Sequence, residues 1–326
     1  MTEPTFDDVL AARERVYQVI RPTGLLRHPL LAELAGFDLY VKHENHNPTG
    51  AFKVRGGLNL IGSLPEAERA SGVMTASTGN HGQSVAFAGR RFGIACTIVV
   101  PQNNNPEKNR AMQALGATLI EHGRDFDEAR EYCEQLAGTR GLRYVHSANE
   151  PLLIAGVGTY ALEVFDDLPH IDVVFVPVGG GSGAAGLGIV RSALHRRTRI
   201  IGVQAAGADT FTRSWRTGTR VAATRVDTIA EGVATRTTFD LTFDILQREL
   251  DDIVTLSEDE LMESVRVAVR TTHNLAEAAG AAPVMAALKV KESLRNRTVV
   301  AVMSGGNLDS RLLSRLFCYG IDKEKR

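Results

Sequence analysis

Residues 173–186 read VVFVPVGGGSGAAG, and this stretch decides the fold. Its β-branched run at 173–178 predicts a buried strand, and the glycines that follow lead into a helical segment. Glycine lets the backbone approach a ligand closely, and the amides at a helix N-terminus attract an anion. The stretch therefore predicts a strand–loop–helix unit whose loop is a phosphate cradle.

The rest of the chain repeats this alternation of short β-branched runs and longer amphipathic segments, which is typical of parallel sheets covered by helices. Further strands are predicted at 38–42, 73–77, 96–100, 118–121, 200–204 and 299–303. The segments 125–128 (DFDE) and 257–260 (SEDE) have the pattern of capping boxes that open helices.

The strands near 73, 96 and 118 predict a small domain at 71–149, inserted between the two parts of a large domain at 1–70 and 150–326. Open α/β sheets bind ligands beyond the carboxyl ends of their strands. We therefore expect the functional site in the cleft between the two domains.

Composition argues against a charged polymer as the partner. The 326 residues include 37 Lys and Arg against 38 Asp and Glu, so we predict neither nucleic acid nor a membrane surface as a partner. The N-terminus, MTEPTFDD, lacks the basic and apolar regions of a secretory signal. Cys96, Cys133 and Cys318 are scattered, which favours a packing role in a reducing compartment. We expect a cytoplasmic protein.

The glycine loop has a second interpretation. Residues 181–186, GSGAAG, match the G-x-G-x-x-G pattern of dinucleotide sites. Such a site needs an acidic residue about 20 positions on, at the end of the next strand, but the strand at 200–204 ends in Gln204. A nicotinamide-dependent oxidoreductase, a plain structural turn and a non-catalytic cofactor-holding protein remain as alternatives.

The segment 44–57, ENHNPTGAFKVRGG, places Lys53 near the start of a predicted helix at 52–62, after a turn marked by Pro48 and Gly50. Burial and a helix N-terminus both favour a neutral amine, which is the form that Schiff-base chemistry requires. A lysine at this place is also commonly a solvated surface residue, so the segment alone leaves both interpretations open.

Two more segments end predicted strands in polar groups. At 77–83, STGNHGQ can hold a carboxylate through the backbone amides of a strand-to-helix junction, or it can be a decorated helix cap. At 301–307, AVMSGGN ends in Ser304, which is either a ligand group or a turn residue.

Taken together and in this order, the four segments resemble the fold-type II pyridoxal phosphate enzymes, specifically the serine/threonine dehydratase and serine racemase family, over about residues 20–317. The resemblance implies an α/β fold like that of the tryptophan synthase β chain, with two open, twisted, mainly parallel sheets and flanking helices. It also implies pyridoxal 5'-phosphate as cofactor, a small amino-acid substrate, a mobile small domain and a homodimer.

The resemblance also assigns the site residues. Lys53 would carry the cofactor as a Schiff base and remove the α-proton of the substrate, and Thr78 would be a second acid/base. The cofactor contacts are Phe52, Lys53, Asn80, Gly179, Gly180, Gly181, Ser182, Gly183, Gly232, Glu277 and Ser304. The substrate contacts are Ser77, Thr78, Gly79, His81, Arg130 and Thr235.

Several of these contacts have defined roles in the resemblance. Asn80 would donate to the phenolic oxygen of the cofactor, the loop at 179–183 would take its phosphate, and Ser304 would meet its pyridine nitrogen. A hydroxyl does not force that nitrogen to be protonated as an aspartate would, which favours elimination over transamination. Without the resemblance, Glu277 could equally be an ordinary carboxylate at a helix start.

The expected reaction is the β-elimination of water from a small β-hydroxy amino acid of the threonine or serine type, giving a 2-oxo acid and ammonia. One alternative is a dehydratase for 3-hydroxyaspartate or an ectoine-derived hydroxy amino acid, in which Arg130 would meet a second carboxylate unless it only covers a solvated helix face. Another is an amino-acid racemase that uses the hydroxyl of Thr78.

The chain departs from the family pattern at two places. Ser182 replaces a glycine of the phosphate loop, but it keeps the backbone amide that a phosphate needs. The segment 204–210, QAAGADT, lacks the carboxylates with which racemases bind a divalent cation, so no metal site is predicted, and Asp209 is expected to face solvent.

Overall fold

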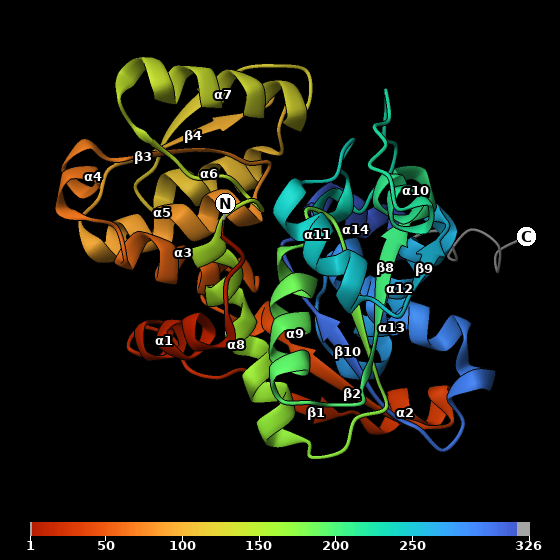
Figure 1. The fold of residues 1–326 in the computed structure, drawn as a ribbon. Helices are drawn as coiled ribbons and strands as arrows, with labels where there is room; N and C mark the ends of the chain where they lie inside the picture. The colour runs from red at the N-terminus through yellow and green to blue at the C-terminus, as the bar shows by residue number, and fades with distance from the viewer. Residues whose placement is uncertain (1, 318–326) are drawn as a thin grey trace, which may run out of the picture.

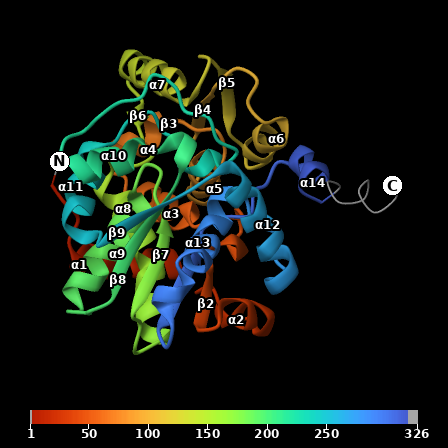
Figure 2. The same cartoon turned by 90° about the vertical axis from the view of Figure 1, so that its right-hand side faces the viewer.

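The strands form two sheets in a computed structural model that describes residues 2–317. The larger sheet has the order β1-β2-β10-β7-β8-β9 and consists of β1 (Leu25–Arg27), β2 (Asp38–His43), β7 (Val173–Pro177), β8 (Arg199–Ala205), β9 (Asp252–Leu256) and β10 (Thr298–Met303). The smaller sheet has the order β5-β4-β3-β6 and consists of β3 (Val73–Ala76), β4 (Cys96–Val100), β5 (Thr118–Glu121) and β6 (Arg143–Tyr144). Figures 1 and 2 show the smaller sheet and its helices as a lobe above the larger sheet.

The described helices connect and cover these strands. The α-helices are α1 (Phe6–Tyr17), α2 (Pro29–Ala35), α3 (Lys53–Gly62), α4 (Glu66–Ser71), α5 (Asn80–Phe92), α6 (Pro106–Ala114), α7 (Phe126–Arg140), α8 (Pro151–Asp167), α9 (Ser182–Ala193), α10 (Thr210–Thr217), α11 (Asp240–Glu249), α12 (Glu258–Thr272), α13 (Ala278–Lys289) and α14 (Ser310–Phe317). The short 3₁₀ helices are η1 (Glu44–His46), η2 (Ala206–Ala208), η3 (Glu231–Val233) and η4 (Lys291–Leu294).

The larger sheet is buried on both faces, which explains why its strands read as nearly continuous apolar runs. In β7, Val173 and Phe175 pack with α2, α12 and α13 on one face. Val174 and Val176 pack with α8, α9 and α11 on the other face. Because the side chains of a strand alternate between its faces, one apolar run supplies both cores.

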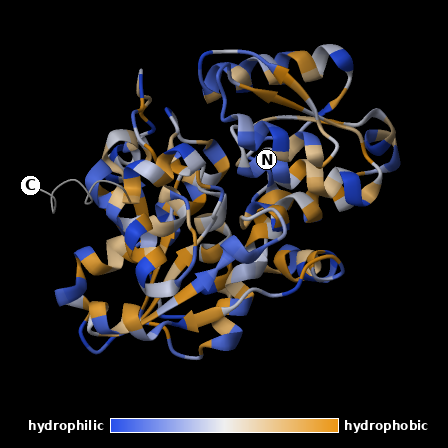
Figure 3. Cartoon of the chain, turned by 180° about the vertical axis from the view of Figure 1, so that it is seen from behind, coloured by the Kyte–Doolittle hydropathy of each residue, from blue (hydrophilic) through white to orange (hydrophobic). Residues whose placement is uncertain are grey.

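The smaller sheet is built in the same way. Ile98 and Val100 of β4 pack toward α3 and α5, whereas Val99 packs toward α7. Figure 1 places α7 on the outer face of this sheet and α5 and α6 on the inner one. Figure 3 shows orange, hydrophobic strands inside the smaller lobe and blue, hydrophilic segments on the outer side of its helices.

The sequence-based strands are confirmed, each with ends within one residue of those observed. All strand pairs are parallel except β1 with β2, so the expected α/β fold with two mainly parallel sheets is confirmed. The sequence analysis missed β1, β6 and β9. The first two are only three and two residues long, and β9 is a half-exposed edge strand whose pattern is weak.

One expected capping box is complete and the other is half formed. Ser257 and Glu260 exchange both hydrogen bonds at the start of α12. Asp125 accepts from the amide of Glu128, but the Glu128 carboxylate turns back to Arg124 instead of to the Asp125 amide. The prediction at 125–128 was therefore correct for the cap and wrong for the reciprocal bond.

Cys96 and Cys133 are buried and unpaired, and Cys318 lies outside the described residues. Asp209 is 38% exposed and pairs with Arg213 at 2.9 Å, four residues further along the chain. Within residues 2–317, the structure has neither a helix long and apolar enough to cross a membrane nor a cluster of three or more metal-ligating side chains.

Candidate active site

A cavity of about 410 Å³ is lined by residues from both sheets. Its walls are loops that follow the carboxyl ends of β3, β4 and β5 in the smaller sheet and of β7 and β10 in the larger one. A third wall consists of the residues around η3. This is the place at which parallel α/β sheets bind ligands, and the volume lies within the usual range for ligand pockets.

Lys53 stands at the first position of α3, where its side chain enters the cavity. Its Nζ donates to the backbone oxygen of Ser147 and to Oγ of Ser182, both at 2.9 Å. It also lies 5.4 Å from the ring centre of Phe52. Burial lowers the pKa of Lys53 to about 8, because desolvation disfavours the ammonium ion. The neutral amine is therefore far more abundant near neutral pH than it is in an exposed lysine, whose pKa is about 10.4.

We expect the uptake of an aldehyde by this amine to follow the same pKa. Because only the neutral amine is a nucleophile, the rate of uptake should rise about tenfold per pH unit below pH 8 and level off above it. Stopped-flow absorbance of the protein freed of small molecules and mixed with an aromatic aldehyde measures this rate. A profile that rises steeply to pH 10 would show an amine with the pKa of an exposed lysine.

The glycine loop between β7 and α9 faces Lys53 across the cavity. The backbone amides of 179–184 lie just before α9 or in its first turn. They donate to no acceptor among residues 2–317. Gly181 has φ +88°, a conformation that glycine adopts without strain. Free amides at a helix N-terminus, together with the helix dipole, bind anions. The loop is therefore built to hold a phosphate.

Gly179 shows why this loop needs glycine. A Cβ atom at this position would lie 2.4 Å from the backbone oxygen of Gly232. We expect Gly179→Ala to displace the loop and weaken anion binding by about 5- to 150-fold, which corresponds to an overpacking cost of about 1–3 kcal/mol. Gly138→Ala is the matched control, because nothing lies within 4 Å of the added atom. Equal phosphate-ester affinity of both variants in a titration would contradict this role.

The loop between β3 and α5 is held by its own first residue. Oγ of Ser77 accepts from the amides of Gly79 at 3.0 Å and Gly82 at 2.8 Å. His81 is buried, and burial lowers its pKa to about 3, so its imidazole is neutral. Its Nε2 donates to Oγ1 of Thr75 at 2.9 Å, because that hydroxyl itself donates to the backbone oxygen of Val145. This loop offers rigid neutral groups to a bound ligand.

A chain of side-chain amides crosses the cavity floor. Nδ2 of Asn307 donates to Oδ1 of Asn80 at 2.7 Å and to the backbone oxygen of Thr49 at 2.8 Å. Nδ2 of Asn80 donates to the buried Glu277 at 2.5 Å. These bonds fix which way the Asn80 carboxamide faces, and they leave it one free N–H. Burial raises the pKa of Glu277, against the opposing effect of nearby Lys108.

The segment before Lys53 is tied to the end of β10. The amide of Phe52 donates to the backbone oxygen of Ser304 at 3.0 Å, and Ala51 bridges to Gly305. The two ends of the chain therefore bring Lys53 and Ser304 to the same cavity.

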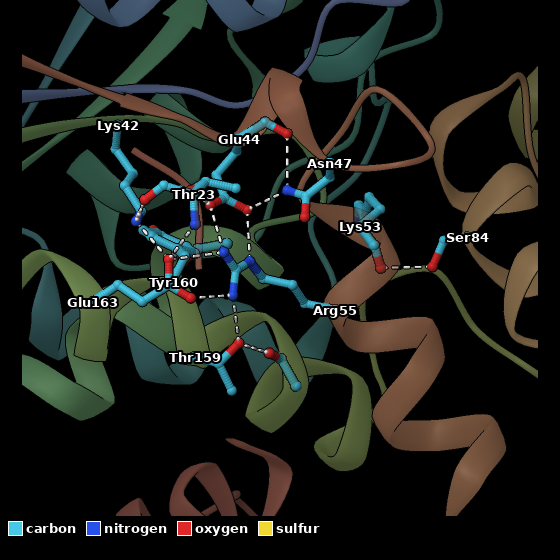
Figure 4. A network of polar contacts seen from close by, with 12 residues as sticks. Thr23, Lys42, Glu44, Asn47, Lys53, Arg55, Ser84, Thr159, Tyr160 and Glu163 are labelled. Atoms are coloured by element: carbon cyan, nitrogen blue, oxygen red, sulfur yellow. Dashed lines mark hydrogen bonds and ion pairs between the residues drawn. The ribbon is translucent and has the colours of Figure 1, made fainter. Parts of the chain in front are cut away.

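A fully buried ion-pair network lies behind Lys53 (Figure 4). Arg55, one turn into α3, pairs with Glu44 at 2.7 Å and with Glu163 of α8 at 2.6 Å. Lys42 pairs with Glu163 at 2.5 Å. Two cations thus face two carboxylates, and the bonds tie α3 to β2, η1 and α8. This network fixes the helix whose first residue is Lys53.

The structure brings most of the predicted site residues to one cavity. The residues that line it are Phe52, Lys53, Ser77, Thr78, Asn80, His81, Gly179, Gly180, Gly181, Ser182, Gly183, Gly232, Thr235, Glu277 and Ser304. Gly79 lies between two of them but does not itself line the cavity.

Arg130 also stays outside the cavity wall. It lies within 4 Å of carboxylates of its own helix, Asp127, Glu131 and Glu134. Its side chain is only 18% exposed. Burial lowers the pKa of His146, next to the cavity residue Ser147, and the charge of Arg130 helps to lower it further.

Sequence reasoning missed two groups at the site. Lys108 of α6 lines the cavity and donates to Glu231 of η3 at 2.5 Å. Asn104 donates to the backbone oxygen of Thr78 at 3.1 Å, which braces the neighbouring loop. Asn-Pro at 105–106 signals the start of α6, but no pattern in the sequence shows that this helix start reaches the cavity.

Comparisons with known proteins agree with this geometry. The model of the family described as pyridoxal-phosphate dependent enzyme matches residues 16–305. An L-threonine ammonia-lyase of Thermotoga maritima is 36% identical over 322 residues, which cover 99% of this chain and 80% of the relative. The processed form of threonine deaminase isoform 2 from Solanum lycopersicum has a TM-score of 0.90 at 34% identity, with 95% of this chain and 91% of the other covered. A pyridoxal 5'-phosphate-dependent aspartate racemase has a TM-score of 0.89 at 30% identity, with 95% and 98% covered.

Proposed function

This chain belongs to the family of pyridoxal-phosphate dependent enzymes, and on that premise we propose that it is an ammonia-lyase that eliminates water from threonine or serine. The products would be a 2-oxo acid and ammonia. The observation that carries the proposal is the part-buried amine of Lys53, bonded to Oγ of Ser182, which ends the glycine loop and begins α9. The names of the relatives, threonine ammonia-lyase and threonine deaminase, support the substrate class.

The residues present fit pyridoxal phosphate. The free amides of 179–184 match its phosphate, and the Lys53 amine matches its aldehyde. Phe52 packs against Gly183, where an added Cβ would lie 3.1 Å from the ring, so a flat apolar wall stands beside the amine. When bound, the cofactor supplies the electron sink that makes the α-proton of an amino acid acidic.

The chain's own groups would bind the substrate and move its protons. The backbone amides of 78, 80 and 81, which are free among residues 2–317, and the hydroxyls of Ser77 and Thr78 would donate to the substrate carboxylate, on a loop that the bonds from the amides of 79 and 82 to Ser77 hold in place. Nζ of Lys53 would accept the α-proton, since its lowered pKa makes the neutral, basic amine more accessible near pH 7 than it is in an exposed lysine. Oγ of Ser304 would face the ring nitrogen without forcing a proton onto it.

The assignment is tested by supplying the purified protein with pyridoxal phosphate and a panel of amino acids. We expect ammonia and the matching 2-oxo acid from L-threonine and L-serine. The absorbance of the bound cofactor should change when borohydride reduces its link to the protein. A protein that binds the cofactor but releases no ammonia from any hydroxy amino acid would refute the proposal.

A second candidate is an enzyme for an acidic amino acid, favoured by the likeness to an aspartate racemase. Its structural support is weaker, because Arg130 is paired on its own helix. The hydroxyl of Thr78 lines the cavity and is the group for racemase chemistry. The same panel, extended to 3-hydroxyaspartate, an ectoine-derived hydroxy acid and D-serine formation, separates these activities.

We also propose residues 71–149 as a small mobile domain and the whole as a cytoplasmic homodimer. The buried, free thiols of Cys96 and Cys133 favour a reducing compartment. Leu26, Leu30 and Leu34 are 46%, 49% and 45% exposed on β1 and α2, which suits a subunit contact. Light scattering of the native protein and of Leu30→Asp tests the dimer.

A further inference from the structure

Lys108 is a largely buried charged residue of the cavity wall to which nothing so far assigns a task. Only 8% of it is exposed, and its stem passes directly beneath the loop at 77–81, since a Cβ on Gly79 would lie 2.7 Å from its Cδ. Its Nζ contacts Glu231 at 2.5 Å. Lys108, Glu231 and Glu277 also line both the main cavity and a smaller one beside it. One ammonium therefore stands near the carboxylates of Glu231 and Glu277, and Asp309, which lines the smaller cavity, adds a third negative charge.

The ionisation state of Glu277 affects the orientation of Asn80, because Nδ2 of Asn80 donates to the Glu277 carboxylate. Oδ1 of Asn80 accepts a second hydrogen bond, from Nδ2 of Asn307, which fixes which end of the Asn80 carboxamide is the oxygen. An ionised carboxylate is the stronger acceptor, so it holds the Asn80 nitrogen more firmly than a carboxylic acid does. The free N–H of Asn80 then points in a defined direction.

We propose that Lys108 is a positioning residue: its ammonium supplies the counter-charge to Glu277 and, through Glu277, orients the Asn80 carboxamide toward the bound cofactor. The inference rests on the proposed function for the meaning of Asn80. Lys108 comes from the smaller lobe, whereas Glu231 and Glu277 belong to the larger one. The charge balance of Glu277 thus depends on a residue that the other lobe brings in.

Two charges act on Glu277 with opposite signs. Burial raises the pKa of Glu277, Lys108 lowers it, and Glu231 raises it further. Removing each neighbour must therefore move the titration of Glu277 in opposite directions. A role of Lys108 limited to its contact with Glu231 makes a different prediction, because breaking that contact from either side would have the same effect.

The experiment compares Lys108→Met and Glu231→Gln in the holoenzyme. For each, kcat/KM for threonine and the absorbance maximum of the bound cofactor are followed between pH 5 and pH 9, with Lys53 already joined to the cofactor so that its free amine does not titrate. We expect Lys108→Met to move the acid limb of both profiles upward by about 1–3 pH units. Glu231→Gln should move it downward. Lys289→Met, which removes an exposed lysine paired with Glu260, is the control and should leave the profiles unchanged.

Shifts in the same direction for both variants, or none in Lys108→Met, would overturn the proposal. If Lys108→Met does not fold, Glu231→Gln decides alone, since an unshifted or raised acid limb in that variant contradicts a charge effect on Glu277. The native protein serves as a separate check on the reaction. Ammonia release from threonine by the native protein tests the proposed function, whereas only the pH shifts test Lys108.

Discussion

Lys53→Ala is expected to lower ammonia release from threonine by about 10⁴-fold or more. The variant loses both the amine that joins the cofactor and the base that accepts the α-proton, and general-base catalysis alone contributes 10²–10⁴-fold. Steady-state assays of 2-oxo acid formation measure the loss. After borohydride treatment, mass spectrometry should find the cofactor on the peptide that contains residue 53 in the native protein and no labelled peptide in the variant.

A variant at a surface lysine is the control that shows whether the loss is specific to Lys53. Lys289 is an exposed lysine paired with Glu260, so Lys289→Ala should retain native activity and labelling. If Lys53→Ala turned over threonine within tenfold of the native rate, the proposed role of Lys53 in catalysis would be excluded. Labelling of another lysine in the native protein would do the same.

Arg55→Met should destabilise the fold by about 3–5 kcal/mol, the usual cost of removing one partner from a buried ion pair. The substitution leaves Glu44 and Glu163 buried with only Lys42 as a counter-ion. Urea unfolding at pH 7 measures the change. The exposed pair of Arg27 and Asp38 provides the control, since Arg27→Met should cost less than about 1 kcal/mol.

The pH dependence of this difference has a definite sign. Burial alone would raise the pKa of Glu44, but the charge and hydrogen bonds of Arg55 outweigh it and hold the pKa below its usual value. A group with a lowered pKa stabilises the fold above its unfolded pKa, about 4.3 for glutamate, and this contribution is lost as the pH falls. The gap between native protein and Arg55→Met should therefore narrow below about pH 4. A gap that widens in acid would contradict the pairing.

Local backbone chemistry explains why so much of the fold could be predicted. The strand at 173–177 and the loop after it follow from β-branched residues, glycines and a helix start, each of which acts within a few residues. The same holds for Lys53, which stands at the start of α3 after a Pro-Gly turn. The short strand β6 could not be predicted, because two residues are too few to show the alternation of side chains that marks a strand.

Groups that depend on tertiary contacts could not be found in this way. Arg55 lies 108 positions from Glu163, and Lys108 lies 123 positions from Glu231, so only the folded chain shows that they pair. Arg130 illustrates the converse. The family resemblance predicts a contact with a second substrate carboxylate, and the structure shows that Arg130 does not line the cavity and pairs with carboxylates of α7. The rotational phase of a helix decides which way such a side chain faces, and one residue turns it by about 100°.

The strand order of the larger sheet has a consequence for biosynthesis. β10, which follows the other described strands along the chain, lies between β2 and β7, and Ser304 comes directly after it. The smaller sheet, by contrast, comes from one continuous stretch and can pair its strands while translation is still under way. The nascent chain must therefore keep β2 and β7 apart, with their apolar edges open, until β10 has been synthesised, and this interval is when it most needs chaperones.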